Sequence, residues 1–159
     1  MASAAAAQEP CASTPGYDRL DFWLGEWDVF SGERKVGTNR IGKILDGCAI
    51  TEEWAGAGGG EGRSLFYFVP TTGEWKQVWV TDTATRTGGV KEKVLIGATD
   101  GGGLQFQGRI LDGAGEAWYD RTTLTPLPSG DVRQLIEISQ DSASWQTIFD
   151  AVYRRSGAW

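Results

Sequence analysis

The residues best suited to chemistry in this sequence are polar side chains interleaved with tryptophans. Glu52 lies two residues before Trp54, and Gln77 lies between Trp75 and Trp79. A carboxyl group in an apolar pocket has a raised pKa, so Glu52 is the candidate catalytic acid or base near neutral pH. Two indoles flanking an amide would give a pocket apolar walls with one donor and one acceptor, which suits a planar or amphipathic ligand.

Both patterns also have structural explanations. A buried Glu52 would ordinarily be paired with an arginine, and Arg63 and Arg121 are the candidates. If the assignment of strand faces is displaced by one residue, Glu53 is the inward group instead. Trp75 and Trp79 would equally fit ordinary packing in the protein core, with Gln77 bonded to backbone or water.

The sequence contains no histidine, which excludes Ser-His-Asp triads, Cys-His dyads and histidine-ligated zinc or haem. Acid–base chemistry must therefore come from Asp, Glu, Lys, Tyr or Cys. We expect no metal and no other cofactor. The net charge of −6 argues against nucleic acid and anionic membrane surfaces as partners. No apolar run is long enough for membrane insertion.

From Glu26 onward the apolar residues recur with a period of two, which is typical of β-strands. Turn pairs such as Ser31-Gly32, Asp112-Gly113 and Ser129-Gly130 separate the alternating segments. The predicted strands are 26–32, 36–45, 47–55, 63–69, 74–82, 89–97, 103–111, 116–125, 131–139 and 146–155. These predict an all-β, ten-stranded antiparallel up-and-down barrel, because closure removes the exposed edges of an open sheet.

The alternation also assigns an inner face to each strand, because apolar members mark the interior. Glu52 then shares a face with Ile50 and Trp54, and Gln134 shares one with Val132 and Ile136. The sequence thus places Glu52, Gln77 and Gln134 in a mostly apolar interior. A barrel of this size has room for one small ligand.

The length of 159 residues suits one domain, predicted as a barrel over 17–159 preceded by a flexible arm over 1–16. We expect a short helix over Tyr17 to Leu24, with Asp18 near its N-cap. The glycine-rich loops at 56–62 and 100–103 lack the following helix of a phosphate cradle. They are predicted turns, or a lid over the barrel mouth.

The N-terminal arm carries a possible export signal. Ala4-Ala5-Ala6-Ala7-Gln8 resembles the small-residue end of a signal peptide, although no hydrophobic region precedes it. The alternative is an alanine-rich tail. The export interpretation predicts a periplasmic or secreted protein and a disulfide between Cys11 and Cys48 that ties the arm to the barrel. Two free thiols are the alternative.

Gly25-Glu26-Trp27, at the start of the first predicted strand, resembles the Gly-x-Trp signature of lipocalins and other calycins. In those folds the tryptophan plugs the closed end of the barrel, and a basic side chain near the barrel's end covers the indole. The resemblance implies that Arg155 lies across Trp27 and that the last strand pairs with the first.

A wider set of motifs resembles the bacterial domain-of-unknown-function family 1579, a calycin-like barrel. They are Phe22–Asp28, Gly37-x-Asn39-x-Ile41, Asp46–Trp54, Gly62–Leu65, Trp75-x-Gln77-x-Trp79, Val132–Gln134 and Phe149-Asp150-x-x-Tyr153-x-Arg155. Together they span nearly all of the chain after residue 16. The chain departs from the family pattern at Phe66–Val69 and at Leu124, where apolar residues replace possible pocket groups, which leaves room for a different ligand. The resemblance implies a fold and no settled activity.

A short stretch before the last strand, Ser139-x-Asp141-x-Ala143-x-Trp145, resembles the Asp-box hairpin. It implies a turn in which Asp141 bonds backbone amides.

The sequence thus predicts a barrel that binds a small apolar or aromatic molecule outside the cytoplasm; it makes no prediction of oligomeric state. The alternatives are a metal-independent pocket enzyme, such as an isomerase, cyclase or hydrolase using Glu52, and a structural or interaction barrel. A roomy pocket with a paired Glu52 would favour the binder, an unpaired Glu52 the enzyme, and a filled interior the structural barrel. The candidate ligand-binding residues are Asn39, Glu52, Trp54, Trp75, Gln77, Trp79, Arg121 and Gln134.

Overall fold

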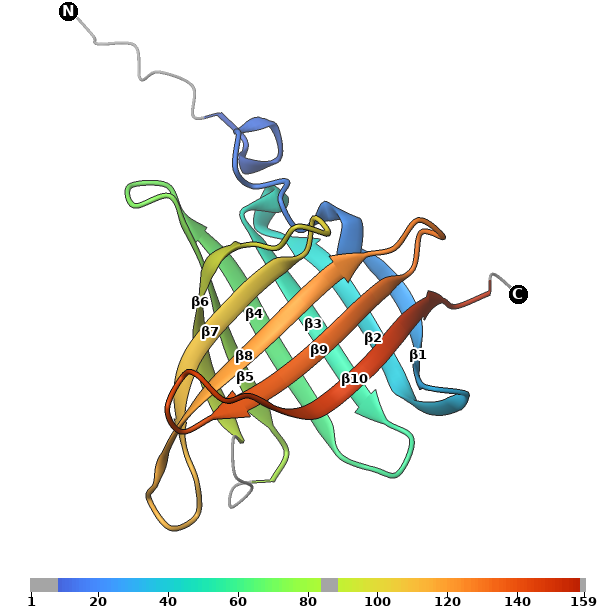
Figure 1. The fold of residues 1–159 in the computed structure, drawn as a ribbon. Helices are drawn as coiled ribbons and strands as arrows, with labels where there is room; N and C mark the ends of the chain where they lie inside the picture. The colour runs from blue at the N-terminus through green and yellow to red at the C-terminus, as the bar shows by residue number, and fades with distance from the viewer. Residues whose placement is uncertain (1–8, 84–88, 158–159) are drawn as a thin grey trace, which may run out of the picture.

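Ten antiparallel strands close into a barrel in the computed structural model, which describes residues 9–83 and 89–157 (Figure 1). Each strand pairs with its neighbours in sequence, and β1 pairs with β10. The strands are β1 (Gly25–Ser31), β2 (Arg34–Ile44), β3 (Ala49–Gly56), β4 (Glu61–Val69), β5 (Glu74–Thr81), β6 (Val90–Ala98), β7 (Leu104–Leu111), β8 (Ala117–Pro126), β9 (Val132–Ser139) and β10 (Gln146–Arg155). The predicted ten-stranded antiparallel barrel and its closure are confirmed. The alanine-rich stretch before Glu9 lies outside the described residues.

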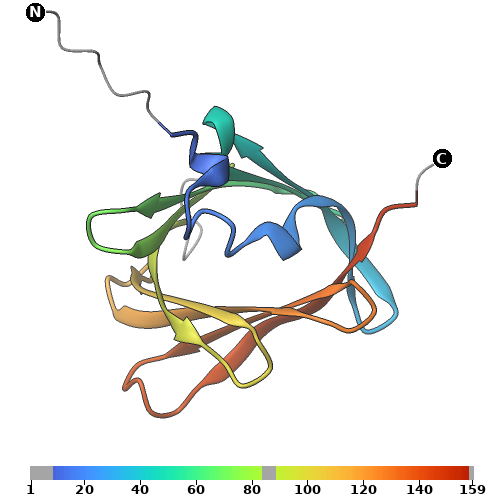
Figure 2. The same cartoon turned by 90° about the horizontal axis from the view of Figure 1, so that it is seen from above.

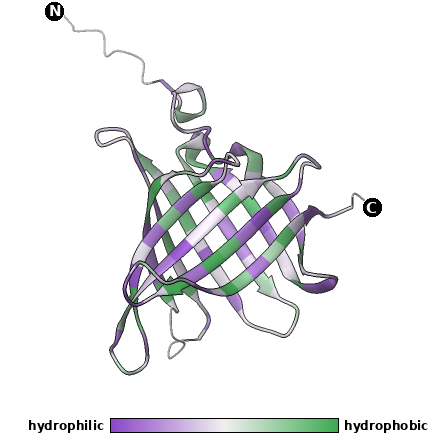
Figure 3. Ribbon diagram, viewed as in Figure 1, coloured by the Kyte–Doolittle hydropathy of each residue, from purple (hydrophilic) through white to green (hydrophobic). Residues whose placement is uncertain are grey.

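Alternation of residue types along the strands explains why these segments form a barrel. Figure 3 shows hydrophilic and hydrophobic residues following one another along each strand. Strand boundaries differ from the predicted ones by at most two residues. At the β2–β3 connection a 3₁₀ helix, η3 (Leu45–Gly47), contains two non-glycine residues with positive φ, Leu45 at 54° and Asp46 at 53°. Strand β3 therefore begins at Ala49, later than the sequence predicts.

The predicted helix over 17–24 is not present as such. Only a three-residue 3₁₀ helix, η2 (Asp21–Trp23), forms there. The indole Nε1 of Trp27 donates a hydrogen bond of 2.9 Å to the Trp23 carbonyl, which is the acceptor that the backbone N–H of Trp27 would use in a longer helix. Gly25, with φ of 138°, then turns the chain into β1.

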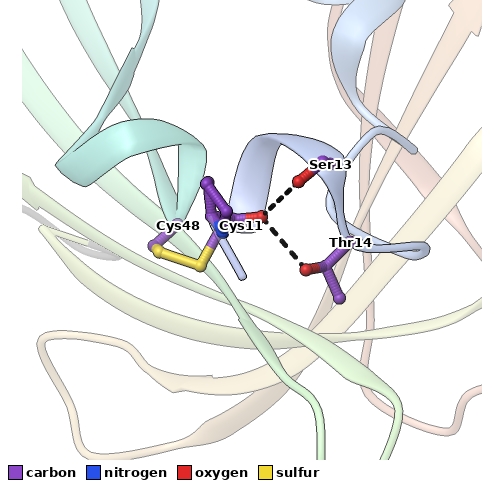
Figure 4. Close-up of a disulfide and its surroundings, with 5 residues drawn as sticks. Cys11, Ser13, Thr14 and Cys48 are labelled. Atoms are coloured by element: carbon purple, nitrogen blue, oxygen red, sulfur yellow. Dashed lines mark hydrogen bonds between the residues drawn. A yellow bond between two sulfur atoms is a disulfide. The ribbon is translucent and has the colours of Figure 1, made fainter. Parts of the chain in front are cut away.

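The segment that precedes β1 crosses one end of the barrel (Figure 2). Cys11, in the 3₁₀ helix η1 (Cys11–Ser13), forms a disulfide with Cys48, with 4.9 Å between their Cα atoms (Figure 4). The predicted pairing is confirmed. The Trp75 indole donates a 2.8 Å hydrogen bond to the Gly16 carbonyl, and Tyr17 packs edge-on against Phe68. These contacts hold residues of the predicted arm against this end of the barrel, which we call the closed end.

Aromatic side chains fill the barrel next to the closed end. Trp23 and Trp27 are fully buried, and Trp23 packs edge-on against Phe66 and Tyr153. The Arg155 guanidinium carbon lies 4.5 Å from the Trp27 ring centroid, and Trp27 and Arg155 are paired between β1 and β10. The predicted cation–π contact is confirmed, and it joins the two strands that close the barrel.

The β9–β10 turn has the predicted Asp-box geometry. One carboxylate oxygen of Asp141 accepts hydrogen bonds from the backbone N–H groups of Ala143, at 2.9 Å, and Ser144, at 2.8 Å. These bonds, with a further one from Ser139, lower the pKa of Asp141 to about 2.

Candidate functional site

A cavity of about 660 Å³ lies in the half of the barrel away from the closed end. Its rim includes Ser31 and Arg34 at the β1–β2 turn and Gly58–Gly60 at the β3–β4 turn, and its floor includes Glu52 and Tyr153. The volume is within the range typical of small-molecule sites. The interior is thus filled at one end and open at the other.

Two tryptophans form apolar walls of the cavity, and each lies against a glycine of the neighbouring strand. A Cβ atom built on Gly37 would lie 2.5 Å from the ring of Trp54, and one built on Gly62 would overlap the ring of Trp79. A larger residue at Gly62 would have to displace the Trp79 indole, and one at Gly37 would clash with both the Trp54 indole and the backbone carbonyl of Ala55. Trp54 also meets Phe149 edge-on, at 6.1 Å between ring centroids. The two glycines therefore let the indoles lie against the barrel wall, which leaves the cavity open.

A chain of hydrogen-bonded polar side chains, which we call the polar belt, crosses the cavity floor over six strands. It consists of Gln77, Ser64, Glu52, Asn39, Tyr153 and Gln134.

In the polar belt, Glu52 accepts hydrogen bonds from both sides, and Gln134 accepts the hydrogen bond at the far end. The Gln77 amide donates to Ser64 at 3.1 Å, and Ser64 donates to Glu52 at 2.6 Å. The Asn39 amide donates to Glu52 at 2.7 Å and to the Tyr153 hydroxyl at 3.3 Å. Burial and the nearby Glu52 carboxylate raise the pKa of Tyr153 well above its ordinary value, so its hydroxyl keeps the proton that it donates to Gln134 at 2.6 Å.

Glu52 faces the interior with only 4% of its surface exposed, whereas Glu53 points outward and pairs with Arg40. Each carboxylate oxygen of Glu52 accepts one hydrogen bond from a neutral donor, and the described residues form no ion pair with it. Burial raises the pKa of Glu52, and the bonds from Ser64 and Asn39 partly offset that rise. The expected arginine partner is absent among the described residues, because neutral side chains take its place.

A second polar cluster combines Lys91 and Lys93 of β6 with Asp120 and Thr122 of β8. The Lys91 ammonium lies 2.7 Å from Asp120, and Lys93 forms an ion pair with the same carboxylate. Lys93 also donates to the Thr122 hydroxyl at 2.5 Å. Sequence reasoning missed this cluster.

The signal that could have found it is weak. In the run 90–95, Leu95 shares a face with the two lysines, but Val90 and Val94 make the opposite face look more apolar. In the structure the valine face is outward, and Val90 is 66% exposed.

The structure brings most of the predicted site residues together. Glu52, Trp54, Gln77, Trp79 and Gln134 line the cavity, and Asn39 is joined to them through the polar belt. Trp75 does not line the cavity, because it packs at the closed end below Gly16. Arg121 lies on the outer face of β8, where it pairs with Glu137 at 2.8 Å and stacks on Trp145 at 3.7 Å. Its neighbours Asp120 and Thr122 take the inner face.

A scan against protein-family models finds no match for this chain, and a search of curated proteins finds none either. Within residues 9–83 and 89–157, no group of three or more Asp, Glu or Cys side chains is arranged to hold a metal ion. In the same residues, no helix has the length and apolar character needed to cross a membrane.

Proposed function

We propose that this protein binds a small apolar or aromatic molecule in the barrel cavity. The observation that carries the proposal is the pair of indoles, Trp54 and Trp79, held against the wall of a 660 Å³ cavity by glycines. Indoles offer a planar ligand large apolar faces. Gln77 offers a polar anchor as well, because its Oε1 atom is buried and accepts no hydrogen bond from the described residues. The resemblance to the calycin-like family 1579 points to the same kind of barrel.

Binding is favoured over the two alternatives by specific contacts. A structural barrel would need a filled interior, and here a cavity of about 660 Å³ remains in it. A pocket enzyme using Glu52 would need a carboxyl group free to exchange a proton with a substrate. Both oxygens of Glu52 instead accept short hydrogen bonds from Asn39 and Ser64, so its geometry fits the role of an anchor for the polar belt.

We also propose that the protein acts in an oxidising compartment, the periplasm or the extracellular space. The disulfide between Cys11 and Cys48 supports this location, because such bonds persist mainly outside the cytosol. The alanine-rich stretch that resembles a signal-peptide end supports it as well.

The binding proposal is tested with N-phenyl-1-naphthylamine, a neutral aromatic probe whose fluorescence rises in apolar surroundings. We expect saturable binding with energy transfer from tryptophan. The variant Trp79→Ala should weaken binding about tenfold, because it removes one apolar wall. The matched control, Trp145→Ala, changes an indole on the outer face and should leave the affinity unchanged. Absence of saturable binding, or equal affinity in Trp79→Ala and wild type, would contradict the proposal.

A further inference from the structure

The two lysines of the second polar cluster face the cavity, whereas its carboxylate does not. Lys91, Lys93 and Thr122 line the cavity, and Asp120 lies behind them with a fully buried side chain. The side chains of Lys91 and Lys93 are only 15% and 3% exposed. One carboxylate balances one ammonium group, so the cluster presents an excess of one positive charge to the cavity.

The protonation states of the cluster support that charge. Burial alone would raise the pKa of Asp120, but the ammonium groups of Lys93 and Lys91 outweigh it and hold the pKa below its ordinary value. Burial lowers the pKa of Lys93 to about 8, against the opposing effect of Asp120, so the ammonium form still predominates at neutral pH.

Strand register places this charge beside an apolar wall. Between β5 and β6, Lys91 is directly opposite Trp79, and Lys93 is directly opposite Gln77. The positive charge thus adjoins one of the two indoles and the unpartnered acceptor of Gln77. Glu52, the other charged group of the floor, interacts electrostatically with Lys93, but the two form no ion pair. Both oxygens of Glu52 are already bonded to Ser64 and Asn39, whereas the two lysines line the cavity beside Trp79.

We propose that Lys91 and Lys93 form an anion subsite, and that the ligand is a planar apolar molecule with one acidic group, such as a carboxylate. This inference rests on the proposed function of the cavity. The acidic group lies against the two ammonium groups, and the ring system lies against Trp79. A hydroxyl or N–H group next to the acid donates to the free oxygen of Gln77. An acidic ligand forms charge-assisted hydrogen bonds with the buried ammonium groups. A ligand without an acidic group would cover the same ammonium groups without pairing them, which lowers its affinity.

The test compares two probes with the same ring skeleton. N-Phenyl-1-naphthylamine is neutral, and 8-anilinonaphthalene-1-sulfonate carries one sulfonate. We expect the sulfonate probe to bind wild-type protein about tenfold more tightly, and to displace the neutral probe competitively, because a charge-assisted contact is added. The variant Lys91→Met should abolish this preference, while Asp120 keeps Lys93 as its partner. Lys76→Met, on the outer face of β5, is the matched control and should keep the preference.

Removing the balancing carboxylate gives a second check. Asp120→Asn takes away the group that opposes the effect of burial on Lys93, so the pKa of Lys93 falls below its value of about 8 in wild type. The preference for the sulfonate probe should therefore decline at a lower pH in Asp120→Asn than in wild type, while binding of the neutral probe stays unchanged. Because Asp120 is buried, thermal unfolding must first show that Asp120→Asn is folded. If it is not folded, Lys91→Met alone tests the anion subsite. Equal or weaker binding of the sulfonate probe to wild type, or an unchanged preference in Lys91→Met, overturns the anion subsite and leaves cavity binding intact. Failure of both probes to bind overturns the proposed function itself.

Discussion

The disulfide at the closed end allows stability and binding to be separated. Its two cysteines are 37 residues apart in the sequence. For a loop of this length, the chain-entropy model of the unfolded state gives a stabilisation of about 4 kcal/mol. At about 2–4 °C per kcal/mol for a domain of this size, the double variant Cys11→Ser/Cys48→Ser should melt about 8–16 °C lower than oxidised wild type.

The assay is thermal unfolding followed by circular dichroism, for oxidised wild type, reduced wild type and the double variant. Reduced wild type should melt close to the variant, and the reductant should not affect the variant. Affinity for N-phenyl-1-naphthylamine below the melting range should be unchanged. The reason is that the bond lies at the opposite end of the barrel from the cavity, and Gly16 and Tyr17 keep their contacts with Trp75 and Phe68.

Two results would refute this reasoning. A melting temperature lowered by less than about 3 °C would show that the closed loop contributes little of the expected entropy. A large loss of probe affinity in the folded variant would show that the closed end and the cavity are coupled.

Three further predictions concern the barrel wall, its closure and its floor. Gly62→Ala should displace the Trp79 indole into the cavity and weaken binding of N-phenyl-1-naphthylamine, whereas Gly113→Ala, where the added Cβ meets nothing, should not; equal affinities would contradict the wall geometry. Arg155→Ala should lower the free energy of unfolding in urea by about 1–2 kcal/mol, because it removes the cation over a buried indole; an unchanged value would contradict the role given to that contact. Glu52→Gln should gain stability relative to wild type as pH rises from 4 to 7.5. The folded-state pKa of Glu52 is raised above its ordinary value of 4.5, so wild type loses this carboxyl's contribution as pH rises through the folded-state pKa. Urea unfolding at several pH values measures the difference, and a difference independent of pH would contradict the buried, raised-pKa carboxyl.

Local patterns were enough to predict the strands. Period-two alternation and glycine-containing turns are short-range signals, and together they placed all ten strands. Closure followed from the need to remove exposed strand edges, and the pairing of Trp27 with Arg155 came from the resemblance to the Gly-x-Trp signature of lipocalins. The helix expected over 17–24 forms only as the short 3₁₀ helix η2. This segment crosses the closed end of the barrel (Figure 2), where Leu20 and Trp23 are fully buried. Tertiary packing of this kind overrides local helix propensity, and a local pattern does not show it.

The candidate site could be predicted only where apolar neighbours marked the inner face. Glu52 was placed correctly because Ile50 and Trp54 flank it, and the glycine and tryptophan pairs were present in the motifs without an evident role. Lys93 was missed because Val90 and Val94 make the opposite face of β6 look more apolar, and only Leu95 marks the face of Lys93 as inward. Its partner Asp120 lies on β8, and only the register across β6, β7 and β8 brings the two together.

The most direct test of the central claim is a crystal structure of the protein with N-phenyl-1-naphthylamine bound. The account predicts the probe inside the barrel, with its rings against Trp54 or Trp79 and above the polar belt, and with both indoles still lying over Gly37 and Gly62. A probe found only on the outer surface, or indoles that fold inward to fill the cavity, would contradict a ligand-binding barrel.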